Sequence, residues 1–255
     1  MPTRAYLVGA AQARLRRTAP GRMFWNHFPW RTKFSDGVTR RVPFGIHRLF
    51  RLWLQEYPGL AHESSRVFDA YRGGDFLDIG AFHGWYNLLL APKAAPGNSF
   101  VAVEPDPQAL APLLQTLTVV RTLFPQLSLS LIDKPMGDGG RAVRIQPGGE
   151  KNHPSFRSVG ATESGCPTLT VDELVGTLRL QPKFIKVDVE GAEHSVLRGM
   201  GNTLAKFRPM LMLEVHPEWL PAPVVVADVF GLLDAHGYTR EPIDDRCLLC
   251  SPRHP

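Results

Sequence analysis

The sequence predicts an α/β fold, in which a mostly parallel sheet is covered by helices on both faces and is preceded by an N-terminal extension. From residue 75 onward, short apolar runs alternate with longer segments of helical spacing, and this alternation is typical of βαβ units. The chain before residue 58 instead shows a hairpin pattern and a large excess of basic residues. We therefore divide the chain into an extension of residues 1–57 and a main domain of residues 58–255.

The extension is expected to contain a hairpin and a helix. The runs Trp30–Phe34 and Val38–Val42 flank Ser35-Asp36-Gly37, and Asp-Gly between two such runs is a strong hairpin signal. Apolar residues then recur with helical spacing over Ile46–Tyr57. A further helix, at about Ala61–Tyr71, is predicted to end at a pair of glycines.

In the main domain we expect five strands of a parallel sheet, the helices between them and two final runs. The strands are predicted, in chain order, at 75–79, 100–104, 128–132, 184–187 and 210–215. The helices are predicted at 107–124, 172–178, 192–207 and 224–236, and the final runs lie near Tyr238 and at 246–251. Residues 134–166 are rich in glycine and proline, and they are predicted to form a long irregular loop, bracketed by short runs at 142–145 and 169–171, that is a candidate substrate lid.

The composition is that of a soluble globular protein. The 255 residues are 44% apolar and 21% charged, and no apolar run approaches the ~20 residues that a membrane-spanning helix needs. Three cysteines indicate a reducing compartment, and we expect a cytoplasmic protein. Residues 1–51 hold 11 Lys and Arg against one acid, whereas residues 52–255 hold 18 against 23 acids. Several interpretations of the basic arm, residues 1–25, stay open: a solvated positive arm, a helix that lies on an acidic partner, membrane surface or glycan, and, if the source is eukaryotic, a transit peptide. A secretory signal is disfavoured, because it would need a longer apolar region.

A ligand site is predicted where the first strand of the main domain turns into its helix. The turn reads Asp-x-Gly-x-x-x-Gly over residues 78–84, and its glycines let the backbone approach a ligand beside a helix N-terminus. A dinucleotide would need Gly-x-Gly-x-x-Gly for its pyrophosphate, whereas S-adenosylmethionine carries no phosphate and has an ammonium group that Asp78 can hold. Glu104, at the end of the second strand, can accept hydrogen bonds from both hydroxyls of a ribose. The pattern favours a methyl donor, and a dinucleotide site and a purely structural turn remain alternatives.

Four ionisable side chains follow the fourth and fifth predicted strands. Asp188 and Glu190 come after one strand, and Glu214 and His216 close the next. Residues two apart share a face of a strand, and open α/β sheets bind their ligands at the carboxyl ends of neighbouring strands. We therefore predict that these four residues form a catalytic cluster. The plainer interpretation is that Glu190 and Glu193 stabilise the N-terminus of the following helix.

Five segments, in this order, resemble the FkbM family of S-adenosylmethionine-dependent methyltransferases. They are Asp-Ile-Gly-Ala-x-x-Gly (78–84), Val-Glu-Pro-Asp-Pro (103–107), Thr-Val-Asp-Glu-Leu (170–174), Ile-Lys-Val-Asp-Val-Glu-Gly-Ala-Glu (185–193) and Leu-Glu-Val-His (213–216). The resemblance covers about residues 60–217. It implies a doubly wound, Rossmann-like sheet of seven strands in the order 3-2-1-4-5-7-6. It also implies O-methylation of a sugar, polysaccharide or secondary metabolite with S-adenosyl-L-methionine as cofactor.

Carried onto this chain, the resemblance assigns the donor site to the glycine turn and to the residues after the second and third strands. Glu104 is assigned to the ribose, and Met136 and Asp133 are assigned to the adenine. The complete set of expected donor-binding residues is Asp78, Gly80, Ala81, Phe82, Gly84, Glu104, Pro105, Asp133, Met136 and Asp188. Phe82 and His83 depart from the family's usual asparagine and small aliphatic residue. Phe82 would reshape the donor pocket, and His83 is either a substrate-facing base or an exposed turn residue.

Methyl transfer to a hydroxyl requires that this group lose a proton, so a general base or a metal ion is expected. We predict Asp188 and His216 as base and orienting residue, with Glu190 or Glu214 holding the other partner. A divalent metal held by Asp188, Glu214 and His216 is the open alternative, and this mixed set of donors would suit Mn²⁺ or Mg²⁺ weakly. The expected partner is a small-molecule or glycan acceptor. Two other functions stay open: a nucleic-acid methyltransferase, although the chain lacks the Asn/Asp-Pro-Pro-Tyr motif, and a non-catalytic binding module.

Overall fold

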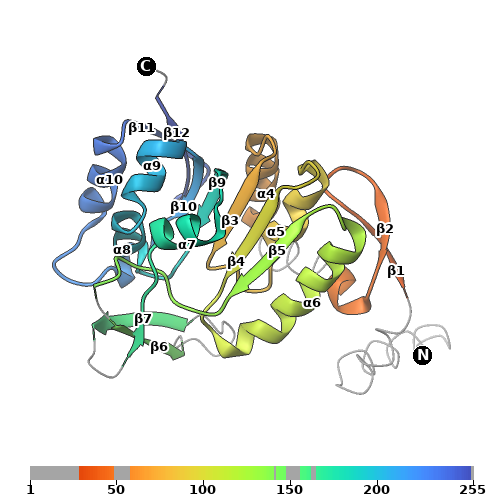
Figure 1. Ribbon diagram of the computed structural model, residues 1–255, viewed down its shortest axis with the longest axis horizontal. Helices are drawn as coiled ribbons and strands as arrows, with labels where there is room; N and C mark the ends of the chain where they lie inside the picture. Colours follow the sequence, from red (N-terminus) through yellow and green to blue (C-terminus); the bar gives the residue numbers. More distant parts are fainter. Residues whose placement is uncertain (1–28, 49–57, 141, 148–155, 162–164, 254–255) are drawn as a thin grey trace, which may run out of the picture. The chain divides into compact units, whose positions relative to one another are not determined.

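The computed structural model describes residues 29–48, 58–140, 142–147, 156–161 and 165–253 (Figure 1). The chain forms two compact units, residues 1–61 and residues 62–255. The basic arm, residues 1–25, lies outside the described residues. Among the residues that the structure describes, no helix has the length and apolar character needed to cross a lipid bilayer.

The hairpin predicted for the first unit is confirmed. Strands β1 (Trp30–Lys33) and β2 (Thr39–Val42) pair in antiparallel orientation. Asp36 holds the turn between them, because its carboxylate accepts from the Val38 N–H at 3.0 Å and binds both terminal nitrogens of Arg40. Residues 44–48 are helical, and the rest of the helix predicted up to Tyr57 lies outside the described residues.

A seven-stranded sheet organises the second unit. Its strands are β3 (Asp75–Ile79), β4 (Ser99–Val103), β5 (Ser128–Ile132), β9 (Pro182–Val187), β10 (Met210–Glu214), β11 (Tyr238–Pro242) and β12 (Cys247–Pro252). Their order across the sheet is β11-β12-β10-β9-β3-β4-β5, and within this sheet β12 alone runs opposite to the other six strands. Read from the β5 edge, this is the predicted order 3-2-1-4-5-7-6. The predicted fold class is therefore confirmed.

Helices pack on both faces of this sheet (Figure 1). They are α4 (Pro58–Ala70), α5 (Trp85–Leu90), α6 (Pro107–Leu123), α7 (Val171–Leu178), α8 (Glu193–Arg198), α9 (Gly201–Phe207) and α10 (Val226–Ala235), with the short 3₁₀ turns η1 (Ala91–Lys93) and η2 (Pro217–Trp219). One face, which includes Leu77 and Ile185, packs against α7, α8, α9 and α10. On the other face Phe76, Phe100 and Phe184 surround the Tyr71 ring, with centroids 6.0–6.3 Å from it. The alternation of apolar residues along each strand thus fills two cores.

The helix predicted before the fifth strand is in fact two helices, α8 and α9, because the chain breaks at Gly199. A Cβ atom on Gly199 would lie 2.0 Å from the carbonyl oxygen of Gly137, so two backbones meet at this point. Asp172 caps the second helix by accepting from the N–H groups of Asn202 and Thr203 at 3.0 and 2.7 Å. The sequence hides this break because its helical periodicity continues across it.

Residues 134–166 are not wholly irregular, so that prediction is wrong in its described part. Strand β6 (Ala142–Pro147) pairs in antiparallel orientation with β7 (Phe156–Ala161) and with β8 (Cys166–Pro167), and the three form a separate small sheet. Glycine is required at 165, because a Cβ atom would lie 2.7 Å from the Val143 carbonyl oxygen. The many glycines and prolines obscured these short strands. A role for the small sheet as a substrate lid stays a prediction.

Candidate active site

The glycine turn after β3 brings two strand ends into backbone contact. Gly80 has a φ of +82°, and a Cβ atom there would lie 1.7 Å from the carbonyl oxygen of Asp188. The N–H groups of Gly80 and Ala81 both donate to the Val103 carbonyl oxygen, at 3.0 and 2.9 Å. Gly84, with a φ of +76°, ends the turn and precedes α5. Glycine at position 80 therefore sets how closely this turn approaches the end of β9.

Glu104 holds the turn in its conformation. It is buried directly after β4, where its Oε2 accepts from the Phe82 N–H at 2.7 Å and its Oε1 accepts from the Asp106 N–H at 2.9 Å. The first of these bonds supports the left-handed backbone of Phe82, whose φ is +46°. Burial raises the pKa of Glu104, although these backbone hydrogen bonds oppose the rise. Each carboxylate oxygen keeps a second lone pair, so the acid can still accept from a ribose hydroxyl.

Asp78 lies beneath the turn and not on its surface. It is fully buried, and its Oδ2 accepts from Nδ2 of Asn87 at 2.5 Å. Its Oδ1 lies 3.7 Å from Nζ of Lys186. Burial raises the pKa of Asp78 to about 6, and the attraction of Lys186 limits the rise. The carboxylate thus stabilises the turn from below, and its contact with an ammonium group of a ligand stays a prediction.

The other residues predicted to contact the donor lie in different environments. Met136 is buried in the core that packs on α7–α10, Asp133 is exposed and Pro105 is half-buried. Phe82 and His83 are both half-buried, and their rings stack with centroids 3.7 Å apart. Burial lowers the pKa of His83 to about 4, so this imidazole is neutral near pH 7. Their assignment to a donor stays a prediction.

Lys186 connects the glycine turn with the acidic cluster, a role that was not predicted from the sequence. The register of β3 and β9 places it beside Asp78. Its ammonium donates to the Gly80 carbonyl oxygen at 2.6 Å and to Oδ2 of Asp188 at 3.0 Å. Burial would lower the pKa of Lys186, but the charges of Asp188 and Asp78 raise it. A lysine inside the apolar run of a buried strand was the available signal, because such a cation needs an acidic partner.

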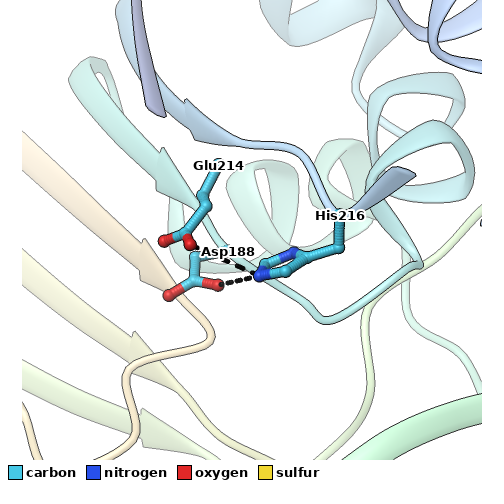
Figure 2. A group of neighbouring side chains, drawn as sticks. All are labelled: Asp188, Glu214 and His216. Atoms are coloured by element: carbon cyan, nitrogen blue, oxygen red, sulfur yellow. Dashed lines mark ion pairs between the residues drawn. The ribbon is translucent and has the colours of Figure 1, made fainter. Parts of the chain in front are cut away.

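The structure brings Asp188, Glu214 and His216 together at the carboxyl edge of the sheet (Figure 2). Nε2 of His216 lies 3.4 Å from Oε1 of Glu214 and 4.0 Å from Oδ1 of Asp188. About a quarter of each carboxylate side chain is exposed (27% and 25%), whereas the histidine side chain is 4% exposed. The three residues meet because β9 and β10 pair in parallel and end at the same edge.

His216 is held on its far nitrogen and on its ring face. Nδ1 lies 2.9 Å from Oε1 of the fully buried Glu193, and the Trp219 ring stacks at 4.7 Å. Burial alone would lower the pKa of His216, but hydrogen bonds with Glu193 and Glu214 and the charge of Asp188 raise it to about 10. The ring is therefore a cation near neutral pH in this arrangement. The interpretation of Glu193 as a helix-stabilising residue misses this contact.

Glu190 reaches the cluster by a different route from the one predicted. Because β9 ends at Val187, Asp188 and Glu190 do not share a strand face. Glu190 instead lies in a turn with a left-handed φ of +53°, followed by Gly191 at +100°. Burial, and then the charge of Asp188, raise the pKa of Glu190 to about 7. A carboxyl group that titrates near neutrality is well suited to accept a proton.

One further acid, Glu63 of α4, lies close enough to the cluster to feel its charges. The Tyr86 hydroxyl donates to its carboxylate. Burial raises the pKa of Glu63 to about 8, and the charges of Glu214 and Asp188 add to the rise. Glu63 was not predicted as a site residue, because the sequence does not show which groups a single acid on an amphipathic helix will contact. In the described part of the site carboxylates outnumber cations, so the site attracts a positively charged group.

A comparison with protein-family models finds one match, to the methyltransferase FkbM domain, over residues 78–239. This match covers more than half of the chain and includes both the glycine turn and the acidic cluster. A search of curated proteins finds no match to the chain.

Solved structures similar to this chain include several methyltransferases. An FkbM methyltransferase from Methylobacillus flagellatus is 17% identical, with 94% of this chain and 60% of that chain covered and a TM-score of 0.48. Fibrillarin from Aeropyrum pernix, solved with natively bound S-adenosyl-L-methionine, is 15% identical, with 71% and 67% covered and a TM-score of 0.38. This chain therefore spans about 60% of the length of the FkbM structure.

Proposed function

The chain belongs to the FkbM family of methyltransferases, and from this premise we propose that it transfers the methyl group of S-adenosylmethionine to a hydroxyl of a sugar, polysaccharide or secondary metabolite. The observation that carries the proposal is the junction of the glycine turn and the acidic cluster at one edge of the sheet. Lys186 makes the two a single polar site, because it bonds to the carbonyl oxygen of Gly80 and to Asp188.

The charges of this edge support S-adenosylmethionine as the donor. The molecule carries a positive sulfonium and a positive ammonium, and at this edge the carboxyl groups of Asp188, Glu190 and Glu214 outnumber the cations Lys186 and His216, which favours both positive groups. Glu104, fixed by two backbone N–H groups, presents oxygens that can accept from a ribose diol. The glycine turn has no Gly-x-Gly for a pyrophosphate, so a dinucleotide fits less well.

The transfer is an in-line displacement, so the site must position the donor and the acceptor and exclude water. The acceptor oxygen bonds to the methyl carbon, the carbon–sulfur bond breaks and S-adenosylhomocysteine leaves. The hydroxyl proton passes to a base, and His216 is unsuited to this role because it already carries a proton near neutral pH. We therefore assign the base to Glu190, whose pKa is raised to about 7, and the orientation of the acceptor to Asp188.

Two measurements test this proposal. Calorimetry with S-adenosylmethionine measures donor binding, and labelled methyl donor with a panel of sugars measures transfer. Glu190→Gln should bind the donor normally and lose about 10²–10⁴-fold in turnover, the usual contribution of a positioned base. Asp234→Asn, at an exposed carboxylate of α10 that pairs with Arg240, is the matched control and should keep full activity. Absence of donor binding would contradict the methyltransferase function, and full turnover by Glu190→Gln would remove Glu190 from the mechanism.

A further inference from the structure

We infer that Asp188, Glu214 and His216 form a binding site for one divalent metal ion of the Mn²⁺ class. One ligand atom from each residue lies within 4.8 Å of the other two. Figure 2 shows the three side chains converging from the ends of neighbouring strands. The ligands of such an ion lie about 2.0–2.2 Å from it, and therefore up to about 4.4 Å apart across it. A small side-chain movement closes the set around an ion.

The residues around these three ligands already orient them. Glu193 occupies Nδ1 of His216 at 2.9 Å, so Nε2 is the nitrogen that faces the two carboxylates. Lys186 occupies Oδ2 of Asp188 at 3.0 Å, and Oδ1 is the oxygen that faces His216. A carboxylate behind a ligating histidine is the usual outer partner at protein metal sites, where it fixes the ring and its tautomer.

The carboxyl groups around the site also favour the binding of a cation. Asp188, Glu190, Glu193 and Glu214 supply four carboxyl groups, against two cations, the ammonium of Lys186 and the imidazolium of His216. The Oε2 atoms of Glu190 and Glu193 are buried and have no hydrogen-bond partner among the described residues, although buried carboxylate oxygens are normally satisfied. Glu193 is itself fully buried, so its carboxylate has no contact with bulk solvent. A divalent ion bound at Nε2 would displace the proton of His216, and its two positive charges would more than replace the one that is lost.

The types of the three ligand atoms indicate which class of metal ion the site would bind. Two carboxylate oxygens and one imidazole nitrogen suit Mn²⁺ better than Ca²⁺, which prefers oxygen ligands alone. The role of the ion rests on the proposed function, although its binding does not. Held by these three residues, the ion would lower the pKa of an acceptor hydroxyl and fix its position, while Glu190 takes the proton.

Binding of Mn²⁺ alone to the full chain tests the site directly. After treatment with a chelator, the protein is titrated with Mn²⁺ and free ion is followed by its electron paramagnetic resonance signal. We expect one bound ion per chain. His216→Gln and Asp188→Asn should each lower the affinity by at least about 10–100-fold, and Glu193→Gln, which keeps all three ligands, by about 10–100-fold. Asp234→Asn should leave the affinity unchanged, and circular dichroism checks that each variant is folded.

Two outcomes would overturn the inference: no binding of Mn²⁺ to the unmodified chain, or unchanged affinity in folded His216→Gln and Asp188→Asn. Calorimetry with S-adenosylmethionine on the metal-free protein separates this failure from failure of the proposed function. Donor binding without Mn²⁺ binding would remove the metal site alone. Mn²⁺ binding without donor binding would keep the site and remove the methyltransferase function.

Discussion

Replacement of Lys186 by methionine is expected to destabilise the protein strongly, because it removes the cation that two carboxylates share. Its ammonium lies 3.0 Å from Asp188 and 3.7 Å from the fully buried Asp78. With an effective dielectric constant of about 20, unit charges at these separations attract by roughly 5 kcal/mol each, and the cost of burying the charges offsets part of this. Removal of one partner from a buried ion pair typically costs about 3–5 kcal/mol, and we expect a loss in this range.

Urea denaturation near neutral pH measures the loss. Lys183→Met, on the same strand but exposed, is the matched control and should change the free energy of unfolding by less than about 0.5 kcal/mol. Addition of Asp78→Asn to Lys186→Met removes the carboxylate that water cannot reach, so the double variant should recover more than half of the loss. A loss as small as that of Lys183→Met, or no recovery in the double variant, would refute the reasoning.

Three further predictions concern stability and are measured by the same denaturation method. Burial raises the pKa of Glu63 from 4.5 to about 8, so between these pH values the folded state binds more protons than the unfolded chain. The free energy of unfolding should therefore fall as the pH rises from 4.5 to about 8. Glu63→Gln should make this fall less steep, and an unchanged slope would contradict the assignment. Gly80→Ala should lower the free energy of unfolding several times more than Gly97→Ala. A Cβ atom at position 80 would lie 1.7 Å from the Asp188 carbonyl oxygen, whereas a Cβ atom at position 97, where φ is a similar +84°, would have nothing within 4 Å. The Gly97 control alone should cost about 1–2 kcal/mol for the left-handed backbone, and equal costs would disprove the close approach. Thr170→Ala should lower the free energy of unfolding by about 1 kcal/mol, because the capping box of α7 is lost. Thr170→Ser keeps the capping hydroxyl and should retain most of this stability. A similar loss in both variants would indicate that packing of the methyl group is responsible instead.

The sheet could be predicted because its central strands are short apolar runs that end at a glycine or an acid. The predicted strand 75–79 agrees with β3 residue for residue, and Gly80 follows it at once. The same local reasoning failed at Gly199, where the break between α8 and α9 depends on a contact with Gly137, 62 positions earlier in the chain. It failed again for β7 and β8, because the glycines and prolines around these short strands are typical of irregular structure, although β7 pairs with β6 only 9 positions away at Pro147 and Phe156.

The site was predicted correctly where its residues follow directly from the ends of the strands. Asp188, Glu214 and His216 converge as expected, because parallel strands that pair end at one edge. The route of Glu190 was predicted wrongly, because the strand stops at Val187 and a left-handed turn follows. His216 was predicted as base or orienting residue; its hydrogen bonds with Glu193 and Glu214 raise its pKa, and only the folded chain shows how many carboxylates surround its ring.

By itself, then, the sequence determined which segments become strands and helices, and which polar residues stand where the strands end. The tertiary structure alone decided the partners of those residues. Lys186 bonds to Gly80 across 106 positions of chain, and Glu193 fixes His216 across 23. The reason is physical: element type depends on side-chain periodicity and turn residues that are neighbours in the chain, whereas the contacts that set protonation and orientation depend on strand register and on which helix packs above which strand end.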